Sequence, residues 1–305
     1  MSFKHYFYAI IAGITIVLGS AVAFNVVMNE FGLYGDMQGK QLRIWGYERA
    51  TKYLFSLNYI PANFEGVILG PSESDVMLDT RKLNAARIYN LSLNGGNICE
   101  LKKLYDNVAE RTKLRYLVIF MSPYILKECS MKTNEISPQV AQSALGSIFT
   151  LRFYGMKLEA MLHPETDPFR ESWWGFRLNN VRETGYDHEK AMQSMANSGF
   201  DLDTEIAPEA ATALAAILST AQAQNSRIIV VYPPIPRPLF DQIRGKYELY
   251  RQQTAKMLPD RCVTIDFNSE EYNALTGDMS NFHDPSHLNE RGAAVVLKAL
   301  DGRLH

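Results

Sequence analysis

The most regular feature of the chain is a series of short apolar runs, separated by longer stretches of mixed polarity. Within a run, aliphatic and aromatic side chains follow one another without alternating with polar ones. Strands covered on both faces in a parallel sheet have this pattern, whereas strands with one face in water alternate. Five strands are therefore predicted, over 66–69, 87–91, 116–120, 228–232 and 263–267.

The stretches between these runs carry helix signals. Asn97 followed by Glu100 has the form of a capping box, and Pro208 stands where a proline favours the first turn of a helix. Strands that alternate with helices are typical of an α/β doubly wound fold with a parallel sheet. Helices are predicted over 97–111, 208–224, 239–257 and 289–301.

One connection is too long to be an ordinary loop. Residues 121–207 lie between the third strand and the helix that begins at Pro208, and they have little strand character. Long structureless connections are uncommon in compact domains unless they are functional. We therefore expect a partly helical insertion near the functional site, within a domain that covers residues 64–305. Residues 31–63 are interpreted as a connecting segment that packs on this domain.

The N-terminal segment differs from the rest, because residues 5–29 contain no Asp, Glu, Lys or Arg. A bilayer core needs about 20 apolar residues, so residues 1–30 are predicted to be an uncleaved, single-span membrane anchor. Lys4 precedes the span, and the positive-inside rule then leaves the rest of the chain outside the cytoplasm. The small-x-small tripeptide ending at Ala23 leaves a cleaved signal peptide, and a secreted soluble protein, as the alternative.

Composition excludes several classes of protein. Among 305 residues, 31 are Lys or Arg and 33 are Asp or Glu, which gives a net charge of −2, and 47% are apolar. The chain is too apolar to be disordered, and it lacks the basic excess of a nucleic-acid-binding protein. Cys99, Cys129 and Cys262 are too few and too scattered for a disulfide framework or a CxxC metal site. We predict no metal and no cofactor, and leave open which cysteine pair bridges in an oxidising compartment.

Candidate chemistry lies after the predicted strands, where parallel sheets bind their ligands. Ser72 follows the first strand, Gly95 follows the second, and Asp284 and His287 precede the last helix. A serine nucleophile needs a base within hydrogen-bond reach and a third group that orients the base. We therefore predict Ser72 as nucleophile, His287 as base and Asp284 as its orienting carboxylate. The backbone N–H group of Ser72 and that of Gly95 or Gly96 are predicted to stabilise an oxyanion.

Each of these residues also has a simpler interpretation. A serine after a strand is often only a helix cap, and Ser74 competes with Ser72 for either role. His283 is a second candidate for the base. Glu73, Asp75 and Asp79 could form a metal cluster, but acidic residues at the start of a helix, where negative charge is favoured, are the better interpretation.

The order of these motifs resembles that of the SGNH (GDSL-type) hydrolase superfamily, whose fold is a flavodoxin-like three-layer α/β sandwich. The resemblance covers about residues 64–303 outside the insertion and rests on the segments ILGPSES, NLSLNGGNICEL and DPSHLNERGA. These segments look most similar to membrane-anchored extracytoplasmic SGNH proteins, which include polysaccharide O-acetyltransferases related to alginate acetylation and D-alanyl transfer proteins of teichoic-acid modification.

The resemblance implies a function and a set of site residues. Ser72, His287 and Asp284 would form the catalytic triad, and Ser72, Gly95 and Asn97 the oxyanion site. The expected activity is that of an extracytoplasmic acyltransferase or esterase, acting through an acyl-serine on O-acyl groups of a cell-surface polysaccharide. A membrane-bound O-acyltransferase is the expected partner.

Two departures from the family pattern bear on this expectation. The usual Gly-Asp-Ser is here Gly70-Pro71-Ser72, and the Gly-x-Asn-Asp block after the third strand is replaced by residues 120–123. The third oxyanion donor is therefore open between Asn94, Asn97 and Ser122, and Asn97 has a sufficient role as a helix cap. A non-catalytic polysaccharide-binding or assembly protein with a degenerate site is the alternative function.

Overall fold

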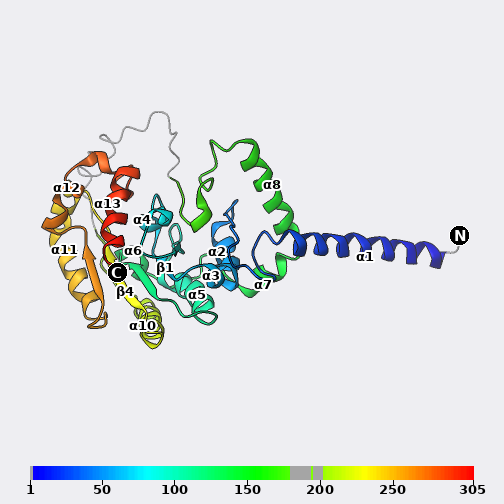
Figure 1. Cartoon of the computed structure of the whole chain (residues 1–305), viewed down its shortest axis with the longest axis horizontal. Helices are drawn as coiled ribbons and strands as arrows, with labels where there is room; N and C mark the ends of the chain where they lie inside the picture. The colour runs from blue at the N-terminus through cyan, green and yellow to red at the C-terminus, as the bar shows by residue number, and fades with distance from the viewer. Residues whose placement is uncertain (1–2, 179–193, 195–201) are drawn as a thin grey trace.

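A five-stranded sheet forms the centre of the computed structural model, which describes residues 3–178, 194 and 202–305 (Figure 1). The strand order is β2-β1-β3-β4-β5, and every neighbouring pair is parallel. This is the order of flavodoxin-like folds, so the predicted α/β class and parallel sheet are confirmed. The strands are β1 (Gly66–Leu69), β2 (Ile88–Asn90), β3 (Tyr116–Phe120), β4 (Arg227–Tyr232) and β5 (Val263–Asp266).

The strands bury both faces, which explains why their apolar residues do not alternate with polar ones. In β1, Val67 and Leu69 belong to one buried cluster and Ile68 belongs to the other. Successive side chains of a strand point to opposite faces, so each face of the sheet needs its own apolar cover.

Helices provide that cover on both faces. On the face of Val67 and Leu69, buried apolar side chains come from α2 (Glu48–Leu57), α3 (Tyr59–Asn63), α5 (Ile98–Ala109), α10 (Pro208–Ala223) and α11 (Arg237–Ala255). On the opposite face, that of Ile68, buried apolar side chains come from α12 (Asn273–Thr276) and α13 (Glu290–Asp301). The predicted capping box of α5 is present, because the Glu100 backbone N–H donates to Asn97 Oδ1 (3.2 Å) and the Asn97 N–H donates to Glu100 Oε2 (3.3 Å).

The predicted insertion, residues 121–207, contains several short helices in its described part. These are α6 (Pro123–Leu126), α7 (Pro138–Ser143), α8 (Ile148–Leu162) and a 3₁₀ turn (Ser172–Trp174). After this turn the chain returns to the main domain, where Arg177 forms an isolated parallel bridge with Val76. Residues 179–193 and 195–201 of the insertion lie outside the described residues. The boundaries of the insertion and of the connecting segment remain predictions.

Helix α1 (Phe3–Met28) projects from the domain and is exposed along its length (Figure 1). It is long and apolar enough to cross a membrane. At 1.5 Å per residue its 26 residues extend about 39 Å, more than the roughly 30 Å of a bilayer's hydrocarbon core.

A disulfide settles which cysteines pair. Cys99, in the first turn of α5, is bonded to Cys129, just after α6, with a Cα–Cα distance of 5.3 Å. Cys262 is a free, half-buried thiol.

Candidate active site

The structure places the predicted site residues at the carboxyl edge of the sheet. Ser72 is the first residue of α4 (Ser72–Asp75), directly after β1. The loop after β2, which contains Gly95, is tied to the Ser72 loop because the Leu93 backbone N–H donates to the Gly70 carbonyl oxygen (3.0 Å). The turn with Asp284 and His287 immediately precedes α13.

Asp284 and His287 are in direct contact. His287 Nδ1 lies 2.8 Å and 2.9 Å from the two carboxylate oxygens of Asp284. The same carboxylate accepts the backbone N–H groups of Ser286 (2.8 Å) and His287 (2.9 Å), which fixes its position. With Nδ1 occupied by the carboxylate, Nε2 is the nitrogen left to act as a base.

Charge around His287 favours its protonated form. Burial acts to lower the pKa of His287, but the hydrogen bond and charge of Asp284 outweigh burial, so the pKa lies above its ordinary value. The charge of Glu73 acts in the same direction, and that of Arg177 opposes it. Burial acts to raise the pKa of Asp284, yet the hydrogen bond with His287 prevails and the pKa is lowered. Asp284 therefore stays ionised where His287 titrates.

Ser72 is held by Glu73 and not by His287. Its hydroxyl donates to Glu73 Oε2 (3.3 Å), and the other oxygen of Glu73 accepts the hydroxyl of Ser122 (2.8 Å). His287 Nε2 is buried and has no hydrogen-bond partner among the residues that the structure describes. The structure thus forms the Asp284–His287 pair but not the Ser72–His287 hydrogen bond.

Ser74, the alternative nucleophile, is part of the buried structure. Its hydroxyl lies 2.7 Å from the Ser92 hydroxyl and 3.1 Å from the Pro71 carbonyl oxygen, and the residue is fully buried. Gly70 is required beside it, because a Cβ there would lie 2.2 Å from Ser74 Oγ and 2.7 Å from Phe120 Cβ. Half-buried Ser72 is the accessible serine of the two.

The predicted oxyanion residues differ in their surroundings. Gly95 has a φ of +60°, a backbone conformation that glycine adopts without strain. Asn97 is fully buried; its Oδ1 accepts two backbone N–H groups of α5, and its Nδ2 donates to the Ser130 carbonyl oxygen (2.6 Å). These contacts make Asn97 a helix cap and do not support its predicted oxyanion role. Ser122 is buried, and its hydroxyl donates to Glu73 Oε1 (2.8 Å).

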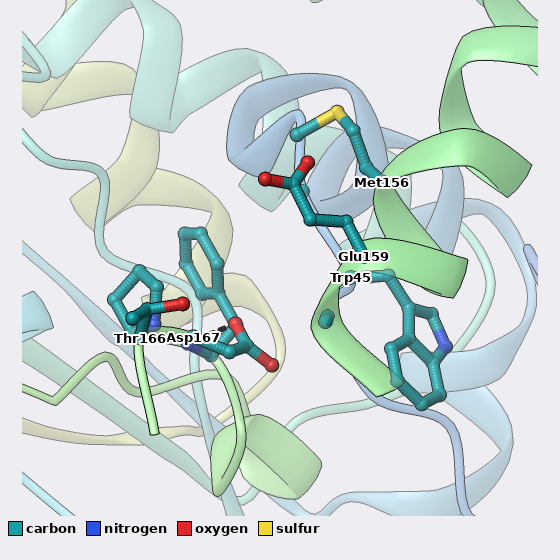
Figure 2. Close-up of a pocket in the computed structure, with 9 residues that line it drawn as sticks. Trp45, Met156, Glu159, Thr166 and Asp167 are labelled. Carbon is teal, nitrogen blue, oxygen red and sulfur yellow. Dashed lines mark hydrogen bonds between the residues drawn. The ribbon is translucent and has the colours of Figure 1, made fainter. Parts of the chain in front are cut away.

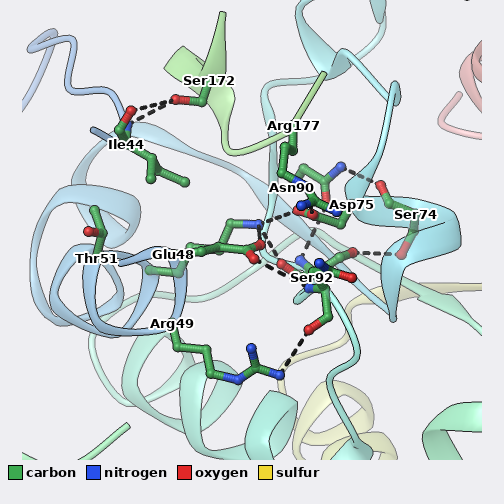
Figure 3. Close-up of polar contacts among 12 residues, drawn as sticks. Ile44, Glu48, Arg49, Thr51, Ser74, Asp75, Asn90, Ser92, Ser172 and Arg177 are labelled. Atoms are coloured by element: carbon green, nitrogen blue, oxygen red, sulfur yellow. Dashed lines mark hydrogen bonds and ion pairs between the residues drawn. The ribbon is translucent and has the colours of Figure 1, made fainter. Parts of the chain in front are cut away.

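A buried ion cluster beneath α4 was not predicted from the sequence. Lys52 Nζ, on α2, lies 2.7 Å from Asp75 Oδ1 and 3.0 Å from Glu48 Oε1. Arg177 Nε lies 3.3 Å from the other oxygen of Asp75 (Figure 3). The side chains of Lys52 and Asp75 are both 0% exposed. No local pattern distinguishes such charges from those of a solvated helix face.

The pKa values of the two carboxylates in this cluster are shifted in opposite directions. Burial, followed by the charge of Glu48, raises the pKa of Asp75 to about 7. Burial opposes ionisation of Glu48 as well, but Lys52 outweighs it and the pKa of Glu48 is lowered. Charge is therefore held most firmly on the Glu48–Lys52 side of the cluster.

The same face of α2 also holds the loop that contains Gly95. Arg49 Nη2 donates to the Asn94 carbonyl oxygen (2.9 Å), and Glu48 Oε2 accepts the Asn94 backbone N–H (3.4 Å). Lys52 in addition donates to the Ser92 carbonyl oxygen. Helix α2 thus contacts both segments that would supply oxyanion donors.

A separate pocket of about 220 Å³ lies between α8 and the segment that follows it (Figure 2). Met156 and Glu159 of α8 line one side, and Thr166 and Asp167 line another. Trp45, also in the lining, is stacked against the Arg43 guanidinium at 3.6 Å from the ring centre. The pocket contains none of the predicted site residues. Among the described residues, no group of three or more His, Cys, Asp or Glu side chains is placed to hold a metal ion.

Comparisons with known proteins give little likeness. No family model matches this chain, and no curated protein matches it. The chain is similar to one solved as "The structure of a putative platelet activating factor from Streptococcus pneumonia", with 9% identity and a TM-score of 0.47 over 85% of this chain and 91% of that chain. A likeness this weak carries no argument about activity, which rests on the chain's own residues.

Proposed function

We propose that the chain is a membrane-tethered, serine-dependent acyltransferase or esterase that acts on O-acyl groups of a cell-surface polysaccharide. The observation that carries the proposal is the oriented Asp284–His287 pair with its free Nε2, which lies close enough to Glu73, the neighbour of the accessible Ser72, for the charge of Glu73 to raise the pKa of His287. A carboxylate that fixes one imidazole nitrogen and leaves the other free is the arrangement of a general base for a hydroxyl nucleophile.

The reaction would proceed through an acyl-serine. Ser72 Oγ attacks the acyl carbonyl carbon while His287 Nε2 takes its proton, and the developing imidazolium is stabilised by Asp284. His287 then gives this proton to the departing alcohol oxygen. In the second half, a sugar hydroxyl or water attacks acyl-Ser72, and the same two proton transfers release the product. Transfer and hydrolysis differ only in which hydroxyl reaches the intermediate.

The step requires Ser72 to exchange Glu73 for His287 as its hydrogen-bond partner. Catalytic hydrogen bonds are often long or absent in free enzymes and form in the substrate complex. The backbone N–H groups of Ser72 and Gly95 would receive the oxyanion, and α2 holds the loop of Gly95 through Asn94.

A location outside the cytoplasm fits two features. Helix α1 is long and apolar enough to span a membrane, and the Cys99–Cys129 disulfide is of a kind that persists in oxidising compartments. An acyl donor would have to reach this side through another membrane protein, for which a membrane-bound O-acyltransferase is the proposed partner. The polysaccharide substrate and the preference for transfer follow from the SGNH resemblance.

The proposal is tested by removing the hydroxyl oxygen of Ser72. Ser72→Ala should abolish release of acyl groups from a chromogenic acyl ester and labelling by a fluorophosphonate. Ser130→Ala, which removes an exposed hydroxyl, is the matched control and should behave like the unaltered protein. Trapping the acyl-enzyme and weighing it would identify the acyl group. Undiminished turnover by Ser72→Ala would refute the assignment.

A non-catalytic binding or assembly role is the second candidate. The observation that favours it is that the hydroxyl of Ser72 donates its hydrogen bond to Glu73 and not to His287. Under this role, Ser72→Ala and His287→Ala would both leave polysaccharide modification in cells intact. For the secreted-hydrolase alternative, the mass of the mature protein shows whether cleavage follows Ala23.

A further inference from the structure

Helix α8 carries a row of exposed apolar side chains. Ile148, Leu151, Leu158 and Leu162 are between 58% and 68% exposed, and Met161 beside them is 61% exposed. Side chains three, four or seven positions apart lie on one face of a helix. The row therefore forms an apolar stripe along α8, with Gly155, which has no side chain, between Leu151 and Leu158.

The opposite side of α8 is packed against the domain. Phe153 is fully buried, and its ring centre lies 4.5 Å from that of Phe31. The ring of Phe149 stacks on the same Phe31 at 5.7 Å. Because these contacts fix the rotation of α8, the apolar row cannot turn inward.

The position of α8 relates this row to the candidate membrane span. Asn25, near the end of α1, donates through Nδ2 to the Leu145 carbonyl oxygen (3.0 Å), and the rings of Phe24 and Tyr154 are 5.7 Å apart. Figure 1 shows α8 running crosswise to α1, at the edge of the domain from which α1 projects. If α1 crosses a bilayer, α8 lies along the plane of its surface.

The charged side chains of α8 lie beside the apolar row and do not interrupt it. Lys157, on α8, forms an ion pair with Glu30, two residues beyond the end of α1. Exposed Arg152 and exposed Glu159 flank the row on one side of α8. A long basic side chain such as that of Arg152 can reach lipid phosphates while its stem stays in apolar surroundings. The row itself contains no charged residue.

We propose that the exposed row of α8 is a second membrane contact, seated in the headgroup and acyl boundary of the bilayer beside α1. A lipid surface is the occupant because the row starts beside the last apolar turns of α1 and runs along the membrane plane. Helices that expose an apolar face bordered by charged side chains bind in this position. With both α1 and α8 attached to the bilayer, the domain could not rotate freely about α1. The sheet edge that carries Ser72 would then keep a constant orientation relative to the membrane. The inference does not depend on the proposed enzyme activity.

The test measures where α8 lies when the full chain is in a bilayer. In a Cys262→Ser background, a nitroxide is attached at Leu158→Cys or Leu151→Cys in nanodiscs of phosphatidylcholine and phosphatidylglycerol that hold one chain each. Leu249→Cys, on α11 at the end of the domain far from α1, is the control and is 50% exposed in the protein (Figure 1). The ratio of oxygen to nickel-chelate accessibility should be several-fold higher at both α8 positions than at the control.

Two outcomes would overturn the proposal. One is equal nickel-chelate accessibility at the α8 positions and the control, which would leave a protein partner as the occupant of the row. The other is protection of α8 only in nanodiscs that hold two chains, with dipolar coupling between the labels, which would make the row a contact between copies. Both labelled positions are exposed, and circular dichroism confirms that each variant is folded before it is measured.

Discussion

Lys52 and Asp75 form an ion pair of 2.7 Å that is closed to solvent and joins α2 to the turn that begins with Ser72. Glu48 and Arg177 complete a cluster of two carboxylates and two cations. A buried ion pair contributes little net stability relative to an apolar pair, but the loss of one member leaves a buried charge without a partner. The pair therefore matters here mainly for the position of α4.

Lys52→Met should lower the free energy of unfolding by about 3–5 kcal/mol, because Asp75 and Glu48 lose their shared cation in a buried site. Urea denaturation measures this loss. Lys102→Met is the matched control, since Lys102 pairs with Asp106 at the surface with side chains 32% and 35% exposed, where such pairs contribute at most about 1 kcal/mol.

The double variant Lys52→Met/Asp75→Asn separates the ion pair from general damage to α2. It should be more stable than Lys52→Met alone, because one of the two carboxylates that lose Lys52 no longer carries a charge. Additive losses from the two substitutions would show that the pair is not coupled in the folded protein.

The pH dependence of turnover should report the charges around His287. A general base acts when neutral, so activity should rise with pH through the His287 pKa, which lies above its ordinary value of about 6.5. Glu73→Gln removes a negative charge that raises this pKa, so the acid limb of the kcat/KM profile should move to lower pH. The control Glu209→Gln, on the exposed start of α10, should leave the limb in place.

Glu73→Gln also weakens the acceptor of the Ser72 and Ser122 hydroxyls, because one of the two carboxylate oxygens becomes an NH2 group that can only donate. If Glu73 only restrains Ser72, the variant keeps or gains activity at neutral pH. A limb that moves to higher pH would contradict the proposed electrostatic role of Glu73.

Loss of the disulfide should destabilise the protein by about 3–4 kcal/mol in the chain-entropy account, because the bond closes a loop of about 30 residues. Cys129→Ser, followed by chemical denaturation, measures the change. Cys262→Ser is the matched control because this thiol is free, and the variant should lose much less free energy of unfolding than Cys129→Ser does. Equal losses from the two variants would mean that the Cys99–Cys129 bond does not stabilise the fold.

The elements that the sequence predicts well are those with local signals. The five apolar runs match the five strands to within one residue at either end, because a strand covered on both faces needs apolar side chains at every position. The capping box of Asn97 and Glu100 is equally local, since its partners are three residues apart. The contact of Asp284 with His287 is also local, and the motif order pointed to it.

Contacts between segments that are far apart in the sequence have no local pattern from which they could be predicted. Lys52 and Asp75 are 23 positions apart, and each looks like a solvated charge in its own helix. The sequence offered Asn97 both as a cap and as an oxyanion residue, and only its burial and its bond to Ser130 favour the cap. Ser72 was predicted to face His287, whereas the nearer carboxylate of Glu73 holds it in the structure.

The sequence by itself determined the parallel sheet, the helices around it and the apolar N-terminal span, because periodicity and capping act over a few residues. Only the tertiary structure decided that Lys52 would be buried against Asp75, that Cys99 would pair with Cys129, and that the apolar row of α8 would stay uncovered beside α1. Those outcomes depend on which surfaces meet when the layers pack, and packing joins residues whose spacing along the chain carries no pattern.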